Sequence, residues 1–137
     1  MLVLIISYKK NGKWNEMKKI SENRFKQLGY KTKTIEGYNL TQHPEIKPNQ
    51  VVYLNFRDKV IPYINKLKFK DGILVAEDDA YISDKLTPTF LLERLKKHKY
   101  IKNILRVGYQ KVLKLPKGKS YPRGYFCVGD QLIWFPK

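Results

Sequence analysis

The chain opens with an uninterrupted apolar run, and this run limits the folds that it can adopt. Residues 2–7 read Leu-Val-Leu-Ile-Ile-Ser, with β-branched members and no alternation of polar and apolar side chains. A strand of this kind is buried on both faces, as happens where helices cover both sides of a parallel sheet. A second short run, Gly72–Ala76, has the same character. The two runs predict an α/β fold with a mostly parallel central sheet flanked by helices.

The residues between these runs fit that fold. Apolar side chains at helical spacing predict an amphipathic helix over residues 13–28, which Gly29 ends. The apolar stripe of this helix consists of Trp14, Met17, Ile20, Phe25 and Leu28. The alternating segment 30–35 predicts a strand, so the chain begins with a strand–helix–strand unit.

Further elements follow from turn residues and apolar spacing. Thr87-Pro88 predicts an N-cap and first residue for a helix that runs to about His98. The apolar side of that helix consists of Phe90, Leu91, Leu92 and Leu95. In chain order we also predict a loop at 37–50, a strand at 51–54, partly helical chain to residue 67, a strand at 104–109, a segment 112–115 that pairs nearby, and a final aromatic strand at 125–134. Without repeats or a linker, residues 1–137 predict a single domain.

Composition indicates an anionic partner. Lysine and arginine total 28 against 12 aspartates and glutamates, a formal net charge of +16. This charge favours phosphates, nucleic acid or an anionic membrane surface, and it equally fits a solubilising lysine-rich surface. The single cysteine, Cys127, allows no disulfide within the chain, which suits a reducing compartment.

Nothing in the sequence predicts a membrane span or a secretory signal. No apolar stretch reaches the roughly 18 residues that a bilayer requires, and the opening run lacks a basic flank and a cleavage site. We therefore expect a soluble cytoplasmic or other intracellular protein. Its richness in lysine, isoleucine, asparagine and tyrosine is typical of AT-rich genomes, including those of some large DNA viruses, so a viral protein is one expectation.

Three acids, Glu77, Asp78 and Asp79, stand side by side after the second apolar run. Adjacent carboxylates repel one another, and a cation relieves this repulsion. Their oxygens suit Mg²⁺ or Mn²⁺, which in turn hold phosphate oxygens. Ligands of open α/β sheets collect at the carboxyl ends of the strands, where this acidic run lies. The run predicts a metal site. The alternative is a solvated turn in which nearby lysines balance the charge of the carboxylates.

Response regulators also carry paired acids after an apolar strand. A receiver domain needs, in addition, a phosphoacceptor aspartate at the end of a later strand. After Asp84 the only acids in this chain are Glu93 and Asp130, and neither is so placed. The pattern therefore excludes a phospho-receiver.

Residues 72–82 resemble the acidic segment of glycosyltransferase family 25, whose lipopolysaccharide-type and collagen-type sugar transferases have a Rossmann-like GT-A fold. The opening strand, the basic helix, the helix after the acidic run and the segment 124–128 agree with that family in order. The resemblance implies a metal-dependent glycosyltransferase in which the acidic run binds Mn²⁺ or Mg²⁺. The metal would bridge the diphosphate of a sugar nucleotide, the donor substrate. Nucleotide contacts are implied at the end of the first strand, by Ser7, Tyr8 and Lys9, and the alternative is a plain exit from the strand into a turn.

The chain also departs from the family. A Gly-Cys-Ser-His-type segment is absent before the acidic strand, where residues 51–58 stand instead, and family members continue beyond the aromatic strand. The alternatives are a minimal transferase, a donor-binding part that needs a partner chain or a second copy of itself, and an inactive relative.

Other residues extend the hypothesis. Asp130 is a candidate catalytic base for the acceptor hydroxyl, although Gly129-Asp130 is also an ordinary turn dipeptide. Arg57 and Asp58 either flank the same cleft or form a surface ion pair. The basic segment 111–123 carries Tyr121 and suits phosphates or stacked bases, or is a solvated loop. It supports an alternative function, a non-enzymatic basic protein that binds nucleic acid or joins a virion or other assembly.

Overall fold

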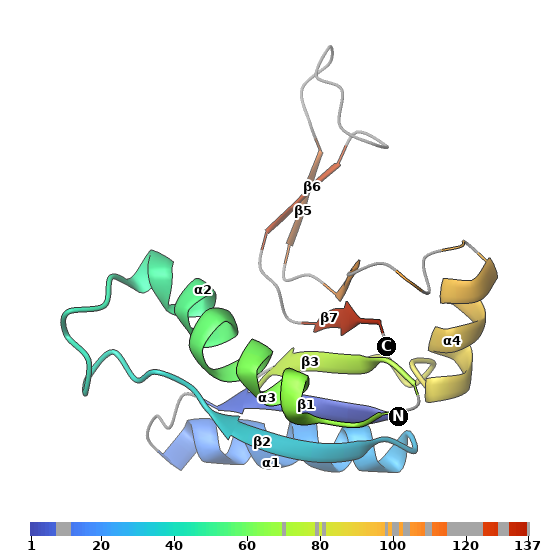
Figure 1. Cartoon of the computed structure of the whole chain (residues 1–137), viewed down its shortest axis with the longest axis horizontal. Helices are drawn as coiled ribbons and strands as arrows, with labels where there is room; N and C mark the ends of the chain where they lie inside the picture. The colour runs from blue at the N-terminus through green and yellow to red at the C-terminus, as the bar shows by residue number, and fades with distance from the viewer. Residues whose placement is uncertain are drawn as a thin grey trace.

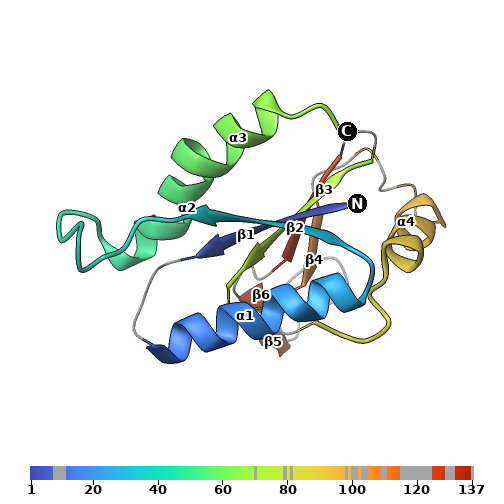
Figure 2. The same cartoon turned by 90° about the horizontal axis from the view of Figure 1, so that it is seen from below.

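The chain folds around a five-stranded sheet with helices on both faces (Figures 1 and 2). The computed structural model describes residues 1–7, 12–69, 71–78, 80, 82–97, 99, 102, 105–108, 111–114, 125–128 and 132–136. The sheet has the order β2-β1-β3-β7-β4. Its strands are β1 (Leu2–Ser7), β2 (Lys31–Glu36), β3 (Ile73–Glu77), β4 (Leu105–Gly108) and β7 (Leu132–Phe135). The helices are α1 (Gly12–Gln27), α2 (Val51–Asn55), α3 (Ile61–Lys66) and α4 (Pro88–Lys97), with a 3-10 turn at Pro48–Gln50 and a π-helical segment, Phe56–Val60, between α2 and α3.

The sheet is mixed, with most of its strands pointing the same way. β1 pairs in parallel with β2 and with β3, whereas β7 pairs antiparallel with both β3 and β4. In this sheet, therefore, β7 alone runs against the others. This confirms the predicted α/β class, the mostly parallel sheet and the opening β1–α1–β2 unit. A separate antiparallel ribbon, β5 (Lys111–Lys114) with β6 (Tyr125–Val128), stands away from the main sheet (Figure 1).

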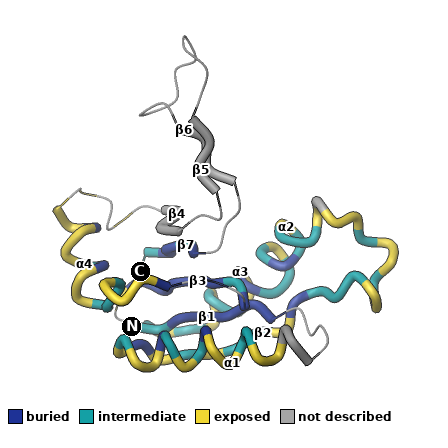
Figure 3. Tube along the Cα trace, turned by 180° about the vertical axis from the view of Figure 1, so that it is seen from behind, coloured by how far each residue is buried: buried dark blue, intermediate teal, exposed yellow. Residues whose placement is uncertain are grey.

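The buried run β1 divides the core into two layers of side chains. Figure 3 shows β1 and β3 as dark, buried stretches of the chain. Val3 and Ile5 belong to a cluster that includes Phe25 of α1 and Leu91 and Leu95 of α4. Because side chains alternate along a strand, the neighbours of Val3 and Ile5 face the opposite layer. There Leu4 and Ile6 pack with Val60 and with partly buried residues of the α2–α3 segment. Both faces of β1 are thus covered, as its apolar run predicts.

Gly29 ends α1 as predicted. Its φ of 92° lies in the left-handed region that glycine adopts without steric cost. Two backbone hydrogen bonds close the helix, from the N–H of Gly29 to Lys26 O and from the N–H of Tyr30 to Phe25 O, each 3.0 Å long. This Schellman arrangement turns the chain directly into β2.

The strand predicted at residues 51–54 is wrong, because these residues form α2. Four β-branched and apolar residues fit one helical turn as well as a short strand. A helix can be told from a strand only by the period of the apolar residues over a longer segment. From Phe56 onward the apolar residues recur every three or four positions, and they pack against the second core cluster. These residues are Phe56, Val60, Tyr63, Ile64 and Leu67. The helical face over 51–66 therefore decides the conformation of its first turn.

Other predictions need smaller corrections. The single final strand expected at 125–134 is two strands, β6 and β7, which belong to different sheets. The N-cap of α4 is confirmed, since the N–H of Phe90 donates to Thr87 Oγ1 at 3.2 Å. Two residues assigned to apolar stripes lie at the surface instead: Ile20 is 67% exposed and Phe90 is 36% exposed.

Candidate functional site

The candidate site lies where the three parallel strands of the β1–β2–β3 unit end. β1 ends at Ser7, β2 at Glu36 and β3 at Glu77. In the register of the sheet, Ser7 is opposite Glu36, and Ile6 is opposite Glu77. Parallel strands present their carboxyl ends at one edge, so this register brings the end of β1 beside the acidic run. Ser7 follows Ile6 and Asp78 follows Glu77, so both residues lie one position beyond the last residues at which β1 and β3 pair with each other.

The predicted site residues divide into two groups. The structure places Ser7, Glu77 and Asp78 together at this edge. Tyr8, Lys9, Asp79, Asp130 and the segment 115–124 lie outside the described residues. Within the described part of the chain, no three histidine, cysteine, aspartate or glutamate side chains form a group that could hold a metal ion. The metal assignment, whose third member is Asp79, thus stays a prediction.

The acids of this edge differ in burial. Asp78 is 2% exposed and Ser7 is 4% exposed, whereas Glu77 is half-buried. Burying a carboxylate is costly unless a charge or a hydrogen-bond donor offsets it. Both Glu77 and Asp78 interact with other groups of the protein. Glu77 and Asp78 therefore belong to the packed end of the sheet and are not fully solvated.

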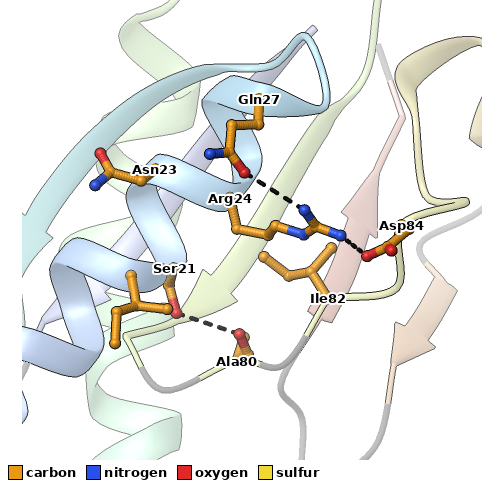
Figure 4. Close-up of a pocket in the computed structure, with 8 residues that line it drawn as sticks. Ser21, Asn23, Arg24, Gln27, Ala80, Ile82 and Asp84 are labelled. Carbon is orange, nitrogen blue, oxygen red and sulfur yellow. Dashed lines mark hydrogen bonds and ion pairs between the residues drawn. The ribbon is translucent and has the colours of Figure 1, made fainter.

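The chain that follows the acidic run lies against α1. Ser21, which is 5% exposed, donates a hydrogen bond from Oγ to the carbonyl oxygen of Ala80 at 3.2 Å. Further along, Arg24 forms an ion pair with Asp84 and donates a hydrogen bond to Gln27 Oε1 at 3.4 Å. Between α1 and residues 80–84 is a groove of about 420 Å³, which Figure 4 shows.

A second polar cluster lies where β2 ends. The N–H of Gly37 donates to Ser7 O at 2.9 Å, and the N–H of Tyr38 donates to Asn55 Oδ1 at 2.7 Å. Asn55 is fully buried, and its Nδ2 atom takes no hydrogen-bond partner among the described residues. A Cβ on Gly37 would lie 2.9 Å from Ile6 Cγ2 and 3.1 Å from Asn55 Oδ1, so only glycine lets Asn55 come this close. Because residues 51–54 were predicted to form a strand, Asn55 was not identified from the sequence as a buried polar residue at this edge.

Arg57 and Asp58 form the ion pair that the sequence offered as one alternative. Arg57 Nε donates to Asp58 Oδ1 at 2.5 Å, and their side chains are 56% and 27% exposed. The Tyr38 hydroxyl donates to the other carboxylate oxygen, Oδ2, at 3.1 Å. Hydrogen bonds from Arg57, first of all, hold the pKa of Asp58 below its ordinary value. The hydrogen bond that Tyr38 donates to Asp58 raises the pKa of the Tyr38 hydroxyl. This hydrogen bond joins the 37–50 loop to the helical layer.

Comparison with known proteins adds no relative. No protein-family model, curated protein or solved structure matches this chain. Among the described residues, no helix is both long enough and apolar enough to cross a membrane.

Proposed function

We propose that this chain binds a divalent metal and a nucleoside-diphosphate sugar, as a GT-A, Rossmann-like domain related to glycosyltransferase family 25. One observation carries the proposal, the parallel pairing of β1 with β3. Its register sets Ser7 beside the acidic run at the carboxyl edge of the sheet. In open α/β sheets this edge receives phosphorylated ligands.

The chemistry follows from the acids. Glu77, Asp78 and Asp79 supply oxygen ligands of the kind that Mg²⁺ and Mn²⁺ prefer. A metal held there would offset the repulsion between the carboxylates and bind diphosphate oxygens, which stabilises charge on a departing nucleoside diphosphate. In this proposal Ser7, at the end of β1, and the Tyr8 and Lys9 that follow it in the sequence contact the nucleotide. Asp130 is the proposed base for the acceptor hydroxyl.

The distribution of lysines favours this function over nucleic-acid binding through one basic face. Exposed lysines of the described residues occur on both helical layers and along the β2 edge. They include Lys19 and Lys26 on α1, Lys31 and Lys33 on β2, Lys66 on α3, and Lys96 and Lys97 on α4. A surface of this kind attracts anions from many directions and concentrates them only weakly at one face.

Thermal unfolding tests the proposal. The melting temperature is measured with Mn²⁺ alone, with UDP or GDP alone, and with Mn²⁺ and each nucleotide together. We expect a rise that needs both components, because a ligand that binds only the folded state stabilises it. The rise should disappear in Asp79→Ala and shrink in Glu77→Gln.

Asp71→Ala is the matched control. Asp71 is an exposed carboxylate just before β3, at the opposite end of the same strand from the acidic run. Its removal changes the net charge as Asp79→Ala does, so the manganese-dependent rise should persist. The proposal is wrong if no nucleotide raises the melting temperature with Mn²⁺ while DNA binds in a salt-sensitive manner.

A further inference from the structure

The groove between α1 and residues 80–84 has the size of a small-molecule site. Its volume is about 420 Å³, and ligand pockets commonly have about 300–1,000 Å³. Ile20, Ser21, Arg24 and Gln27 line it from the helix, and Ala80 and Ile82 line it from the other side. None of these residues has a part in the proposed metal and diphosphate site.

The floor of the groove is part of the core. Ala80 and Ile82 are each 4% exposed and pack in the cluster that includes Phe25 of α1. The Ser21 hydrogen bond fixes the backbone at Ala80. The floor of the groove is therefore formed by packed residues and is in place before a ligand binds.

The rim offers polar groups without net charge. Arg24 reaches from α1 toward Asp84, and this ion pair offsets both charges (Figure 4). Asn23 and Gln27 are exposed and stand four residues apart, one helical turn. Each carboxamide carries donors and an acceptor, and Gln27 Oε1 already accepts the hydrogen bond from Arg24, which leaves its N–H groups toward the rim. Neutral ligands with many hydroxyl groups match this rim, since a hydroxyl also donates and accepts.

Apolar surface completes the recognition chemistry. Ile20 is 67% exposed at the edge of the groove, although a helix normally turns such a residue inward. Together with Ala80 and Ile82 it offers apolar contact beside the amides. A sugar ring combines the same two properties, because its C–H faces are apolar and its hydroxyl groups lie around the edge.

The groove also begins next to the acidic run. Ala80 lies only two residues beyond Asp78, and Ala80, Ile82 and Asp84 line the groove. We propose that the groove binds a sugar ring, either the donor's sugar or that of the acceptor, an inference that rests on the proposed function. The metal and diphosphate would lie at the sheet edge, and the sugar would extend along α1.

Amide chemical shifts of the ¹⁵N-labelled full chain test this inference. Spectra are recorded in Mg²⁺, which is not paramagnetic, with free glucose, galactose, mannose, N-acetylglucosamine and lactose, and with UDP compared with UDP-glucose. We expect saturable shifts over residues 20–27 and 80–84, including the side-chain amides of Asn23 and Gln27. Shifts with free sugars would identify an acceptor site. Shifts with UDP-glucose but not UDP would identify the place of the donor's sugar.

Paired variants supply the control. Asn23→Ala with Gln27→Ala should weaken sugar binding at least about tenfold, the loss of about 1.4 kcal/mol. Asn65→Ala, which removes an exposed amide from α3 on the other face of the sheet, should leave it unchanged. The inference is overturned if no sugar shifts these residues, or if the double variant binds as well as the wild type. If it fails while UDP still binds with the metal, the proposed function stands. If free sugars shift these residues but no nucleotide binds with the metal, the groove is a sugar site and the proposed transferase function is wrong.

Discussion

Ser21 and Ala80 are 59 positions apart in the sequence, yet the Ser21 hydroxyl donates a 3.2 Å hydrogen bond to the Ala80 carbonyl oxygen. The contact joins the middle of α1 to the chain that leaves the acidic run. It thus connects α1, which follows β1, with the segment that follows β3, on the face of the sheet that contains the groove.

Ser21→Ala should lower the free energy of unfolding by about 1 kcal/mol, because the buried carbonyl of Ala80 loses its donor. Urea unfolding measures this change. Thr89→Ala is the control, since Thr89 is exposed on α4 and its replacement also raises helix propensity. A Ser21→Ala protein as stable as the wild type would show that the contact contributes nothing.

Gly72→Ala should destabilise the chain strongly. A Cβ at this position would lie 2.1 Å from Trp134 Cη2 and 2.5 Å from Phe135 O. Trp134 is 1% exposed, so neither the indole nor the β7 backbone has room to move without disturbing the core. We expect a loss of about 1–3 kcal/mol or more, the usual cost of overpacking.

Thermal unfolding of Gly72→Ala and Gly29→Ala separates overpacking from backbone strain. Gly29 has a φ of 92° but open space around its Cα, where the nearest atom to an added Cβ is Pro88 Cδ at 3.9 Å. Its replacement should cost only the left-handed strain, about 1–2 kcal/mol. A smaller loss for Gly72→Ala than for Gly29→Ala would contradict the packing of Trp134 against Gly72.

Local patterns were sufficient for much of the fold. The apolar run of β1, the helix α1 and the stop at Gly29 each depend on neighbouring residues, and the structure confirms these three elements, although Ile20 of the predicted α1 stripe lies at the surface. The pattern was insufficient at residues 51–54, because so short a window cannot distinguish a strand from a helical turn. The two-strand ending also depends on pairing between distant segments, which a linear pattern does not contain.

The sequence predicts only those parts of the candidate site that come directly after the end of a strand. The acidic run was placed at the carboxyl edge because β3 ends there. The groove could not be predicted, since its two walls meet only through tertiary packing. Ile20 illustrates the limit: a helical wheel assigns it to the apolar stripe, but the chain at 80–84 leaves it uncovered.

Asn55→Ala should lower the free energy of unfolding by about 1–3 kcal/mol. The fully buried Asn55 accepts a 2.7 Å hydrogen bond from the N–H of Tyr38, and its removal leaves that donor without its partner. Urea unfolding checks the change, with Asn65→Ala on the exposed side of α3 as control. Equal stabilities for the two variants would contradict a structural role for the buried amide.

Asp58→Asn should destabilise the chain at neutral pH and lose this effect in acid. Hydrogen bonds from Arg57, followed by that from Tyr38, lower the pKa of Asp58 below its ordinary value of 3.8. A carboxylate with a lowered pKa in the folded state stabilises that state fully above the ordinary value. The stabilisation fades as the pH falls through the lower folded value, where the carboxylate takes up a proton. The difference between wild type and Asp58→Asn should therefore shrink below about pH 4.

Urea unfolding from neutral pH down to about pH 3 measures this difference. The same comparison in an Arg57→Gln background is the control, because Arg57 is the main cause of the lowered pKa. In that background, Asp58→Asn should have a smaller effect that changes less with pH, and the cycle isolates the coupling of the two side chains. A difference that stays constant or grows toward low pH would show that the folded state does not stabilise the charged form of Asp58.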